Sequence, residues 1–385
     1  MQKYDVCIIG GGASGLVAAI RVKDLKPDAS VVVLEKLWQV GRKVAASGNG
    51  RCNLSNVECP DWERTSAFFS NIGLLTRIDE AGRIYPYSED GRDVVNLLKK
   101  ACEARGVEIM MGRPVTRLQA VDSGGFKISA DFNKPKAYRP KPEDVPIELE
   151  ATCVLIATGG KSKPEFGTTG DGYSFARELG HSVTPLIPAL TGIMTEEDTK
   201  GADLTGIRQK ALVVLKDSGN IVFQDQGEVQ FTDYGLSGIC IFDMSRFLEG
   251  KDFSKYTIEV DFVPEIGMDE LYELVLQDGL TSIVKGPIAK VIKDKTFGSD
   301  EPWVQLKGLT FHPNGLRGWD MAQVTKGGVP LSEVDEHTGE SSITPGIFFS
   351  GEMLDVDFRC GGFNLQNAWS SGLRAAEGMV ARLDV

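Results

Sequence analysis

The feature that most constrains the fold of this chain is a glycine-rich stretch near its N-terminus, GGGASG, at residues 10–15. A short apolar run from Val6 to Ile9 comes directly before it and predicts a buried parallel strand. A helical pattern of apolar residues follows, and a second apolar run at 31–34 ends in Glu35. The stretch fits the G-x-G-x-x-G pattern in the strand–turn–helix context that this pattern needs. These residues therefore predict the first βαβ unit of a dinucleotide-binding α/β fold.

The residues of the turn have separate physical roles in holding a dinucleotide. Gly10 permits the tight turn from strand to helix, Gly12 lets the backbone approach a pyrophosphate, and Gly15 lets helix and strand pack closely. Ala13 and Ser14 open the helix, whose N-terminus offers free N–H groups and a positive dipole end to the phosphates. The sequence therefore predicts a pyrophosphate site at this turn.

The acid at the end of the second predicted strand indicates which nucleotide binds. Glu35 can accept hydrogen bonds from a ribose with a free 2′-hydroxyl group, as in FAD or NAD, whereas NADP carries a phosphate there. The alternative is a glycine-rich turn in an unrelated α/β protein, which requires no acid at this position. We therefore expect FAD or NAD as the bound dinucleotide.

Lys36 leads into a polar loop, where an NAD dehydrogenase would usually continue into a helix and a third strand. Residues 42–56 read RKVAASGNGRCNLSN, with three positive charges, many small residues and no helix or strand pattern. Small residues let a backbone lie against a flat ring, and Arg42 and Lys43 can balance phosphate charge. The loop is therefore a candidate cofactor loop. Cys52 within it has no partner cysteine nearby and is expected to be a buried packing residue.

The order of GGGASG, LEK at 34–36 and this loop resembles the two-dinucleotide-binding flavoproteins related to glutathione reductase. More closely, it resembles the bacterial HI0933-type family of FAD enzymes, also called the aminoacetone oxidase or bile-acid reductase-like family. Two later segments support the resemblance. They are ATGG at 157–160 after a predicted strand, and GE at 351–352 followed by GG at 361–362 before a predicted helix. The resembling segments span nearly the whole chain and imply an FAD-dependent oxidoreductase.

The resemblance also implies which residues contact FAD. It places the 42–56 loop along the flavin and pyrophosphate and Val115 at the adenine. It directs the positive end of the helix after Gly362 toward the flavin pyrimidine, where it would stabilise negative charge on a reduced flavin. The implied cofactor-binding residues are Gly10, Gly12, Ala13, Ser14, Gly15, Glu35, Lys36, Arg42, Lys43, Ser47, Gly48, Asn49, Gly50, Arg51, Asn53, Val115, Ala157, Thr158, Gly159, Gly160, Gly351, Glu352, Gly361, Gly362, Phe363 and Asn364.

The pattern and the resemblance together predict an α/β chain with a discontinuous Rossmann-like FAD-binding domain and an insert. The first domain has a parallel sheet and a smaller β-meander, and the insert is an antiparallel β domain with a small helical part. The expected boundaries are 1–190, 191–322 and 323–385. In the insert, Asp-Ser-Gly at 217–219 and Gln-Gly at 226–227 are expected to be turns between short strands. The flavin and a substrate are expected at the seam of the two domains.

The expected chemistry is flavin hydride transfer on a small organic metabolite, as an oxidase or a reductase. The cofactor supplies the redox step, and the protein supplies orientation, electrostatics and control of solvent. The chain has no second full G-x-G-x-x-G unit, so a dedicated NAD(P)H domain is not expected. Transient NAD(P)H binding as an electron donor stays open.

The sequence leaves the catalytic residues open, and the candidates are Asp233, Tyr234 and Arg359. Asp233 or Tyr234 could act as an acid or base, and the alternative is a turn at a strand end. Arg359 could bind a substrate carboxylate, and the alternative is a solvent-facing side chain. Relatives often have His at the position of Asp233, and Gly and Tyr where this chain has Phe358 and Phe363. These departures put a direct transfer of the substrate class in doubt and motivate a non-catalytic flavin-binding protein as one alternative.

Cysteine and histidine usage argues against a metal site. The seven cysteines show no CxxC spacing, so neither a zinc site nor a disulfide framework is expected. His181 follows a predicted helix and is expected to be structural, while His312 and His337 lack metal-ligand spacing. We expect no bound metal.

Charge and hydropathy indicate the partners. The net charge of −12 works against a broad nucleic-acid footprint, so a small molecule is the expected partner. The basic loop Lys134–Lys141 keeps a flavin-dependent RNA-modifying enzyme open as an alternative, although a solvated loop is the simpler explanation. No apolar run approaches the roughly 20 residues of a membrane span, and MQKYDVCIIG lacks signal-peptide features. We expect a cytoplasmic protein, and nothing indicates its oligomeric state.

Overall fold

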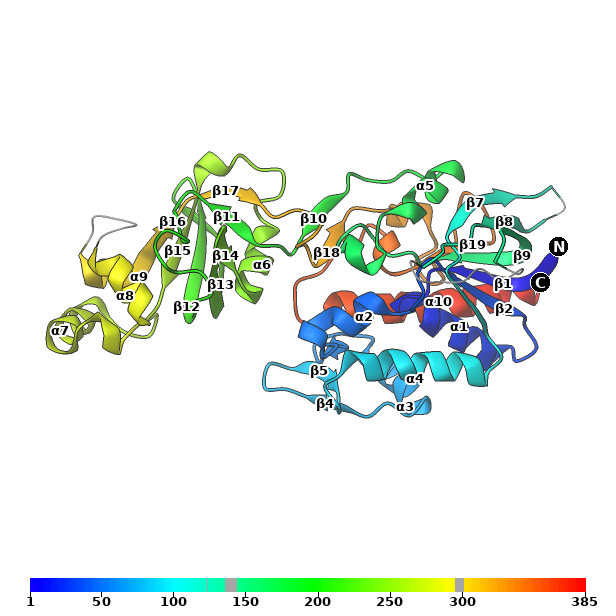
Figure 1. The fold of residues 1–385 in the computed structure, drawn as a ribbon, viewed down its shortest axis with the longest axis horizontal. Helices are drawn as coiled ribbons and strands as arrows, with labels where there is room; N and C mark the ends of the chain where they lie inside the picture. The colour runs from blue at the N-terminus through cyan, green and yellow to red at the C-terminus, as the bar shows by residue number, and fades with distance from the viewer. Residues whose placement is uncertain (123, 136–143, 295–300) are drawn as a thin grey trace. The chain divides into compact units, whose positions relative to one another are not determined.

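The structure is a computed structural model that describes residues 1–122, 124–135, 144–294 and 301–385 (Figure 1). The chain divides into two compact units. Unit 1 comprises Met1–Leu186 and Val324–Val385, and unit 2 comprises Ile187–Gln323. Unit 1 contains the glycine-rich turn and the loop at 42–56, so every residue of the predicted cofactor site lies in it.

A sheet with a parallel centre organises unit 1. Its strand order is β6-β2-β1-β9, with β19 on the second half of β9 and the antiparallel strands β8 and β7 on its first half. The strands of unit 1 are β1 (Gln2–Ile9), β2 (Val31–Glu35), β3 (Ser55–Asn56), β4 (Thr76–Ile78), β5 (Arg83–Pro86), β6 (Glu108–Met111), β7 (Val115–Ala120), β8 (Phe126–Ala130), β9 (Ile147–Ile156), β18 (Val324–Lys326) and β19 (Ile347–Phe349).

The register of this sheet brings distant segments to one edge. Ile9 pairs with Leu34 on one side and with Ile156 on the other, and Ile156 pairs with Phe349. Because these strands are parallel, the segments that follow them lie along the same carboxyl edge. The glycine-rich turn, Glu35, the ATGG segment and the Gly-Glu pair therefore meet there, although they are far apart in the sequence.

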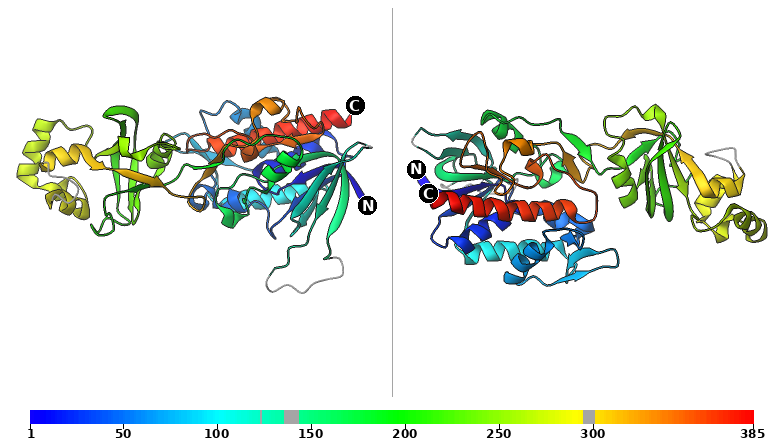
Figure 2. Two further views of the ribbon diagram at one scale, coloured as in Figure 1. Left: turned by 90° about the horizontal axis from the view of Figure 1, so that it is seen from above. Right: turned by 180° about the vertical axis from the view of Figure 1, so that it is seen from behind.

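Helices cover both faces of the sheet, and α1, α4 and α10 lie together on one of them (Figures 1 and 2). Val6 and Ile8 of β1 are buried beneath this layer, whereas Cys7 and Ile9 face the core on the other side, with α5. At Gly372 of α10 an added Cβ would come 2.5 Å from the Ser14 oxygen, so a glycine permits the close crossing with α1. The helices of unit 1 are α1 (Ala13–Leu25), α2 (Arg42–Ala46), α3 (Trp62–Asn71), α4 (Gly91–Ala104), α5 (Asp171–Glu178) and α10 (Phe363–Leu383), with 3₁₀ helices η1 (Ser47–Gly50), η2 (Pro164–Phe166), η5 (Leu331–Glu333) and η6 (Gly351–Met353).

Unit 2 is built on an antiparallel sheet in the order β16-β15-β12-β13-β14-β11-β17. Its buried face forms a separate core with α6 and the helices of the insert. The strands are β10 (Ile187–Ala189), β11 (Ile193–Thr195), β12 (Arg208–Asp217), β13 (Asn220–Thr232), β14 (Gly235–Ser237), β15 (Tyr256–Asp261), β16 (Leu309–Phe311) and β17 (Pro313–Leu316). The helices are α6 (Ile239–Ser245), α7 (Met268–Asp278), α8 (Gly286–Lys293) and α9 (Pro302–Gly308), with η3 (Phe253–Lys255) and η4 (Leu280–Ser282).

The expected fold class is confirmed, and two local expectations are wrong. The Gln-Gly pair at 226–227 is no turn, because β13 continues through it. Gly227 pairs with Ala211 and lies against Cys240, where an added Cβ would come within 3.2 Å. The loop at 42–56 is not free of helix or strand either, because it opens with α2 and η1 and ends in β3. The strand at 226–227 and the helices in the loop depend on contacts with residues distant in sequence, which local sequence patterns do not predict.

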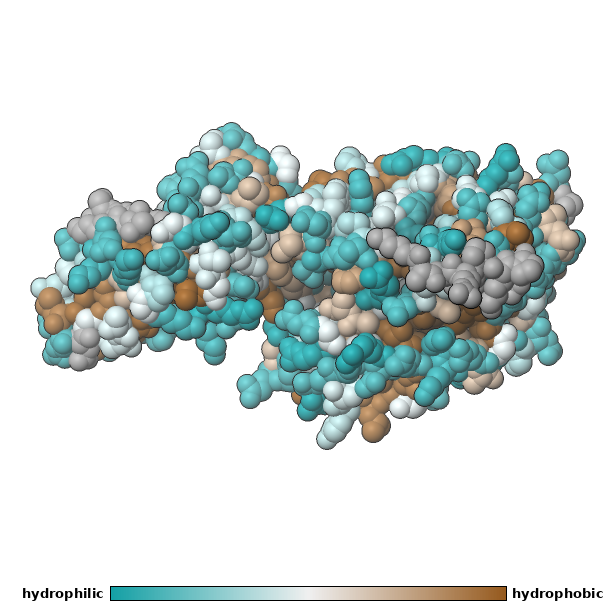
Figure 3. Space-filling view, viewed as in Figure 1, coloured by the Kyte–Doolittle hydropathy of each residue, from teal (hydrophilic) through white to brown (hydrophobic). Residues whose placement is uncertain are grey.

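The surface is mostly polar. In Figure 3, hydrophilic residues cover most of the visible face, with apolar residues in smaller groups between them. None of the helices in the described ranges is both long and apolar enough to cross a bilayer. Across the same ranges, no group of three or more His, Cys, Asp and Glu residues could hold a metal ion.

Candidate functional site

The glycine-rich turn has the shape that an anion cradle needs. Gly10 has a φ of 111°, and an added Cβ would come 2.4 Å from the Ala157 oxygen. At Gly15 an added Cβ would come 2.1 Å from the Gly10 oxygen, so strand and helix leave no room for a side chain. Gly12 differs, because within the described residues an added Cβ would meet nothing within 4 Å. The turn is thus closed on its packed side and open beside Gly12.

The start of α1 offers unpaired donors to that open side. Gly12 is the N-cap, no side chain caps the helix, and the first turn carries no acidic residue. The first N–H groups of a helix lack partners within the helix, and the helix dipole favours an anion beside them. The open space and the donor set therefore fit the pyrophosphate of a dinucleotide.

Glu35 is held at the end of β2 beside the turn. Its carboxylate accepts hydrogen bonds from the backbone N–H of Gly11 at 2.9 Å and of Leu37 at 2.8 Å. Burial raises the pKa of Glu35, and the two N–H donors oppose that rise because they stabilise the charged form. A fixed acceptor at this place suits ribose hydroxyl groups and repels a ribose phosphate.

Lys36 does not compensate for that repulsion. Its ammonium group lies 2.5 Å from the carboxylate of Asp171 and 2.5 Å from the hydroxyl of Thr169, both at the start of α5. The lysine charge is therefore already paired, and this part of the site fits FAD or NAD better than NADP.

The loop at 42–56 folds back on itself through left-handed residues. Gly48 and Asn49 have φ values of 57° and 58°, and Cys52 has a φ of 58°. The Cys52 N–H donates to the Ser47 oxygen at 2.9 Å, which closes the loop. Cys52 is fully buried, and burial raises the pKa of its thiol to about 12, so it is the packing residue that its lack of a partner predicted.

The same loop packs against the start of α10. Trp369 donates from its indole nitrogen to the Leu54 oxygen at 3.0 Å, and Asn56 donates to the Gly361 oxygen at 3.2 Å. An added Cβ at Gly362 would come 2.4 Å from the Ser55 oxygen, so only glycine allows this approach. The loop and the Gly-Gly pair, 305 residues apart, thus form one wall.

Two of the buried polar atoms of unit 1 that lack partners within the described residues are Oδ1 of Asn53, which faces Gly362 of this wall, and Oγ of Ser350, which directly follows β19. Buried polar atoms in folded proteins are nearly always hydrogen-bonded, so an unpaired one needs an explanation. A ligand that carries hydroxyl and N–H groups, as the ribityl chain and flavin ring of FAD do, would supply partners for both.

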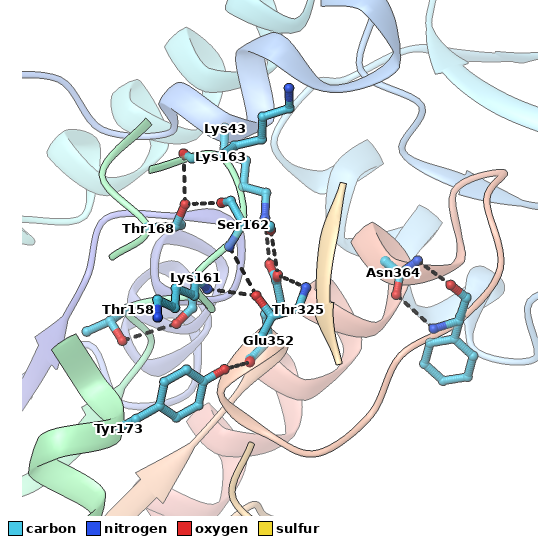
Figure 4. Close-up of polar contacts among 12 residues, drawn as sticks. Lys43, Thr158, Lys161, Ser162, Lys163, Thr168, Tyr173, Thr325, Glu352 and Asn364 are labelled. Carbon is cyan, nitrogen blue, oxygen red and sulfur yellow. Dashed lines mark hydrogen bonds and ion pairs between the residues drawn. The ribbon is translucent and has the colours of Figure 1, made fainter. Parts of the chain in front are cut away.

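Glu352 is the centre of a polar cluster that joins four segments (Figure 4). Its carboxylate accepts hydrogen bonds from the Thr325 N–H at 2.7 Å and from the Ser162 hydroxyl at 3.0 Å. Lys43 of α2 forms an ion pair with it at 2.7 Å, and the buried Tyr173 donates to its backbone oxygen at 2.8 Å. The carboxylate is therefore occupied by protein partners. Thr325, Ser162 and Tyr173 were not predicted, because nothing local in the sequence marks them as neighbours of Glu352.

The ATGG segment is packed into this cluster. An added Cβ at Gly160 would come 2.3 Å from the Thr325 hydroxyl, and Thr158 lies 3.1 Å from the sulfur of Met353. The backbone N–H of Lys161 donates to the Thr325 hydroxyl at 2.7 Å. The segment is thus held rigidly where the carboxyl ends of β1 and β9 meet.

A short segment before α10 is fixed by its own side chains. Asn364 accepts from the Phe358 N–H at 2.9 Å and donates to the Phe358 oxygen at 2.8 Å (Figure 4). The Arg359 guanidinium group forms an ion pair with Glu58 and lies 4.6 Å from the centre of the Phe363 ring. Arg359 is therefore engaged within unit 1, and its predicted role in binding a substrate carboxylate stays a prediction.

Substitutions in the Glu58–Arg359 pair can distinguish a structural role of Arg359 from a role in substrate binding. If Arg359 serves to hold this segment, Arg359→Ala and Glu58→Ala are both expected to lower stability slightly, and Arg359→Ala somewhat more because it also loses the contact with the Phe363 ring. Because the pair is exposed, each change should be within about 1 kcal/mol in chemical denaturation. A rise in KM that appears with Arg359→Ala and not with Glu58→Ala would contradict this role and favour substrate binding.

The remaining predicted residues lie in different places. Val115 starts β7 in unit 1, next to the Pro114 oxygen that accepts the Asp131 N–H at 2.9 Å. Asp233 and Tyr234 form the turn between β13 and β14 in unit 2, so they belong to a different unit from Arg359. His181 is buried, and its ring nitrogens Nδ1 and Nε2 lie at hydrogen-bonding distance from the Glu333 carboxylate, at 2.9 Å, and the Ser341 hydroxyl, at 2.7 Å, as expected of a structural histidine.

Comparison with known proteins identifies the family that this chain matches and several similar proteins. The model of the HI0933-like protein Rossmann domain matches residues 4–66 and 61–378. A 3-dehydro-bile acid delta(4,6)-reductase of Clostridium scindens is 33% identical, over 97% of this chain and 98% of that protein. A ribosomal RNA dihydrouridine synthase of Haemophilus influenzae is 26% identical, over 98% of each.

A solved structure shares the fold at low sequence identity. The 3-ketosteroid-delta4-(5alpha)-dehydrogenase of Rhodococcus jostii, in complex with 4-androstene-3,17-dione, matches with a TM-score of 0.55 and 17% identity. The match covers 98% of this chain and 97% of the dehydrogenase.

Proposed function

Because the chain belongs to the HI0933-like family of FAD-dependent oxidoreductases, we propose that unit 1 binds FAD and that the protein oxidises or reduces a small organic metabolite. The observation that carries the proposal is the turn at residues 10–15, which is open beside Gly12 and faces the uncapped N-terminus of α1. When bound, FAD supplies hydride transfer.

The residues of unit 1 have distinct roles in this proposal. The N–H groups at the start of α1 bind the pyrophosphate, and Glu35 accepts hydrogen bonds from the adenosine ribose. Asn53 and Ser350 offer their unpaired oxygens to the ribityl chain and the flavin ring. The N-terminus of α10, which no side chain caps, directs its positive end toward the flavin.

The cluster around Glu352 has a supporting role. Lys43 and Glu352 neutralise each other, so they contribute little net charge, and they hold α2, the ATGG segment and β18 in place. Val115 and the 42–56 loop complete the site at the adenine and flavin ends. A preorganised site of this kind lowers the entropic cost of binding a large cofactor.

We propose a substrate class from the relatives. The name of the Clostridium scindens relative describes reduction of carbon–carbon double bonds in a 3-oxo compound. We therefore propose that the substrate has a carbon–carbon double bond conjugated to a carbonyl group, or the saturated counterpart of such a bond. Phe358 and Phe363 depart from the family pattern, so the proposal is limited to this chemical class and does not extend to bile acids.

The glycine-rich motifs of the sequence indicate how an electron donor would bind. The chain has no second full G-x-G-x-x-G unit, and the glycine-rich turn is assigned to FAD. We propose that NAD(P)H reduces the flavin in a transient encounter instead of occupying a domain of its own.

An anaerobic two-step experiment tests this function. NAD(P)H should bleach the flavin absorbance of the purified protein, and an added enone of the right structure should restore it while becoming saturated. Failure of a broad panel of enones and saturated ketones to change the flavin spectrum would reject the substrate class. Failure of any NAD(P)H to bleach it would reject only the donor.

RNA modification is the second candidate, because the Haemophilus influenzae relative matches over 98% of its length. Part of the basic stretch Lys134–Lys141 lies outside the described residues, and the net charge of −12 opposes RNA binding. Reduction of a uracil ring also acts on a carbon–carbon double bond conjugated to a carbonyl group. The two candidates therefore differ in whether that bond belongs to a small metabolite or to RNA. Tight binding of ribosomal RNA at low salt that weakens steeply with added salt would favour this candidate.

A further inference from the structure

Three segments of unit 1 meet beside the end of β2, where Glu35 lies. They are residues 36–38 after β2, 112–114 after β6 and 131–133 after β8. The Arg113 N–H donates to the Glu35 oxygen at 2.8 Å, and the Gly112 N–H donates to the Leu37 oxygen at 2.9 Å. The second segment is therefore hydrogen-bonded to the first beyond the ends of both strands.

The third segment is hydrogen-bonded to both of the others. The Asn133 N–H donates to the Gly112 oxygen at 2.8 Å, and the Asn133 side-chain amide donates to the Lys36 oxygen at 3.2 Å. The indole N–H of Trp38 donates to the Asn133 oxygen at 2.7 Å. Asn133 thus uses its backbone N–H, its carbonyl oxygen and its side chain to join the three segments.

An aromatic and cationic cluster packs at this crossing. The Phe132 and Trp38 rings meet edge to face with centroids 5.5 Å apart, and the Arg113 guanidinium group lies 5.0 Å from the centre of the Phe132 ring. Gly112 has a φ of 69°, and an added Cβ would come 2.6 Å from the Trp38 ring, so a glycine lets the indole lie this close. We call Trp38, Arg113, Phe132 and Asn133 the clamp.

The clamp joins two strands that the sheet keeps apart. β2 and β7 are separated by β1, β9 and β8 in the strand order, although residues 112–114 alone connect β6 to β7. Glu35 ends β2, and Val115 starts β7. The backbone of Arg113 is bonded to Glu35, and the Pro114 oxygen accepts an N–H from the third segment at 2.9 Å. These bonds link the start of β7 to the end of β2.

We propose that the clamp positions the adenosine half of the bound dinucleotide. The inference rests on the proposed function, which assigns Glu35 to the adenosine ribose and Val115 to the adenine. A nucleoside that is held from two strands binds best when those strands are fixed before it arrives, and β2 and β7 do not pair directly. The side chains of the clamp are therefore positioning residues, which act on the cofactor through the backbone at Glu35 and Val115.

The clamp and the flavin end of the site lie on different segments. The contacts described above join residues within 35–38, 112–114 and 131–133. The wall assigned to the flavin is made of the 42–56 loop and the start of α10 at Gly362. Weakening the clamp should therefore impair binding of the adenosine half and spare binding of the flavin half.

The test measures three ligands on the FAD-free chain by titration calorimetry. FAD contains both halves, ADP contains only the adenosine half, and FMN contains only the flavin half with one phosphate. Each substitution removes the edge-to-face ring pair, and Trp38→Ala also removes the indole hydrogen bond. We expect Trp38→Ala and Phe132→Ala to bind FAD and ADP about 10-fold more weakly, and FMN less than about 2-fold more weakly.

Tyr87→Ala is the matched control. The Tyr87 ring also lies in unit 1 beneath an arginine, with Arg77 at 5.4 Å, as the Phe132 ring lies beneath Arg113 at 5.0 Å. This control should match the wild type with all three ligands. Trp38→Phe keeps an aromatic ring and loses the indole N–H, so its affinity for ADP should lie between those of wild type and Trp38→Ala.

Two results would overturn the inference and leave the proposed function intact. One is an equal loss of affinity for ADP and FMN in Phe132→Ala and Trp38→Ala, because the clamp would then support unit 1 as a whole. The other is an affinity for ADP in both variants that equals that of Tyr87→Ala. A folded wild-type chain that binds neither FAD nor ADP would reject the proposed function together with the inference.

Discussion

Gly12→Asp is expected to abolish FAD binding while leaving the chain folded. Gly12 is the N-cap of α1, with a φ of −87° and a ψ of −163°, a conformation that aspartate adopts readily. Within the described residues an added Cβ there meets nothing within 4 Å, so the side chain is accommodated. Aspartate is also a favourable N-cap residue, worth about 1 kcal/mol relative to alanine. Without cofactor, the variant should be at least as stable as the wild type.

The same side chain would occupy the space assigned to the pyrophosphate with a charge of the same sign. Two unit charges at about 4 Å repel by roughly 4 kcal/mol at an effective dielectric constant of 20, or about 10³-fold in affinity. Gly12→Asn is the matched control, because it has the same size and capping ability without the charge. Its affinity for FAD, measured by quenching of flavin fluorescence, should lie between those of wild type and Gly12→Asp. Equal affinity in Gly12→Asp and wild type would show that the pyrophosphate binds elsewhere.

Glu352→Ala is expected to have the largest effect on the stability of unit 1. The substitution leaves the buried Thr325 N–H and the ammonium group of Lys43 without their acceptor. Loss of a partner for a buried donor costs about 1–3 kcal/mol. We expect the free energy of unfolding of the FAD-free protein to fall by roughly 2–3 kcal/mol in urea denaturation.

Glu352→Gln is the control for that prediction. Its amide oxygen can still accept from Thr325, so most of the hydrogen bonding survives and only the ion pair with Lys43 is lost. We expect a loss of about 1 kcal/mol or less, because both side chains are partly exposed. If the alanine variant unfolds at the same urea concentration as the wild type, Glu352 does not hold the four segments together.

The sequence predicted the fold class because the strongest signals are local. The strand from Val6, the turn at 10–15 and the following helix lie within one stretch of chain, and each has a pattern of its own. Parallel strand order then brings Glu35 and the ATGG segment to the same edge as the turn. The resemblance of the later segments extended this expectation to the rest of the chain.

The contacts around Glu352 could not be predicted, because they join residues far apart in sequence. The backbone N–H of Thr325 in β18 donates to Glu352, which follows β19, and no periodic pattern in the sequence predicts such a contact. The same reason explains Gly227, where a glycine lies inside a strand to admit Cys240 instead of making a turn. The hydrogen bond of Trp38 with Asn133 was also missed, because the two residues are 95 positions apart.

FAD binding by unit 1 is tested most directly by the visible absorption spectrum of the purified protein after incubation with FAD and removal of free FAD by gel filtration. We expect retention of a single FAD per chain, with the two absorption bands of oxidised flavin, and loss of both bands in Gly12→Asp. A folded wild-type protein that is colourless after this treatment would show that unit 1 does not hold FAD.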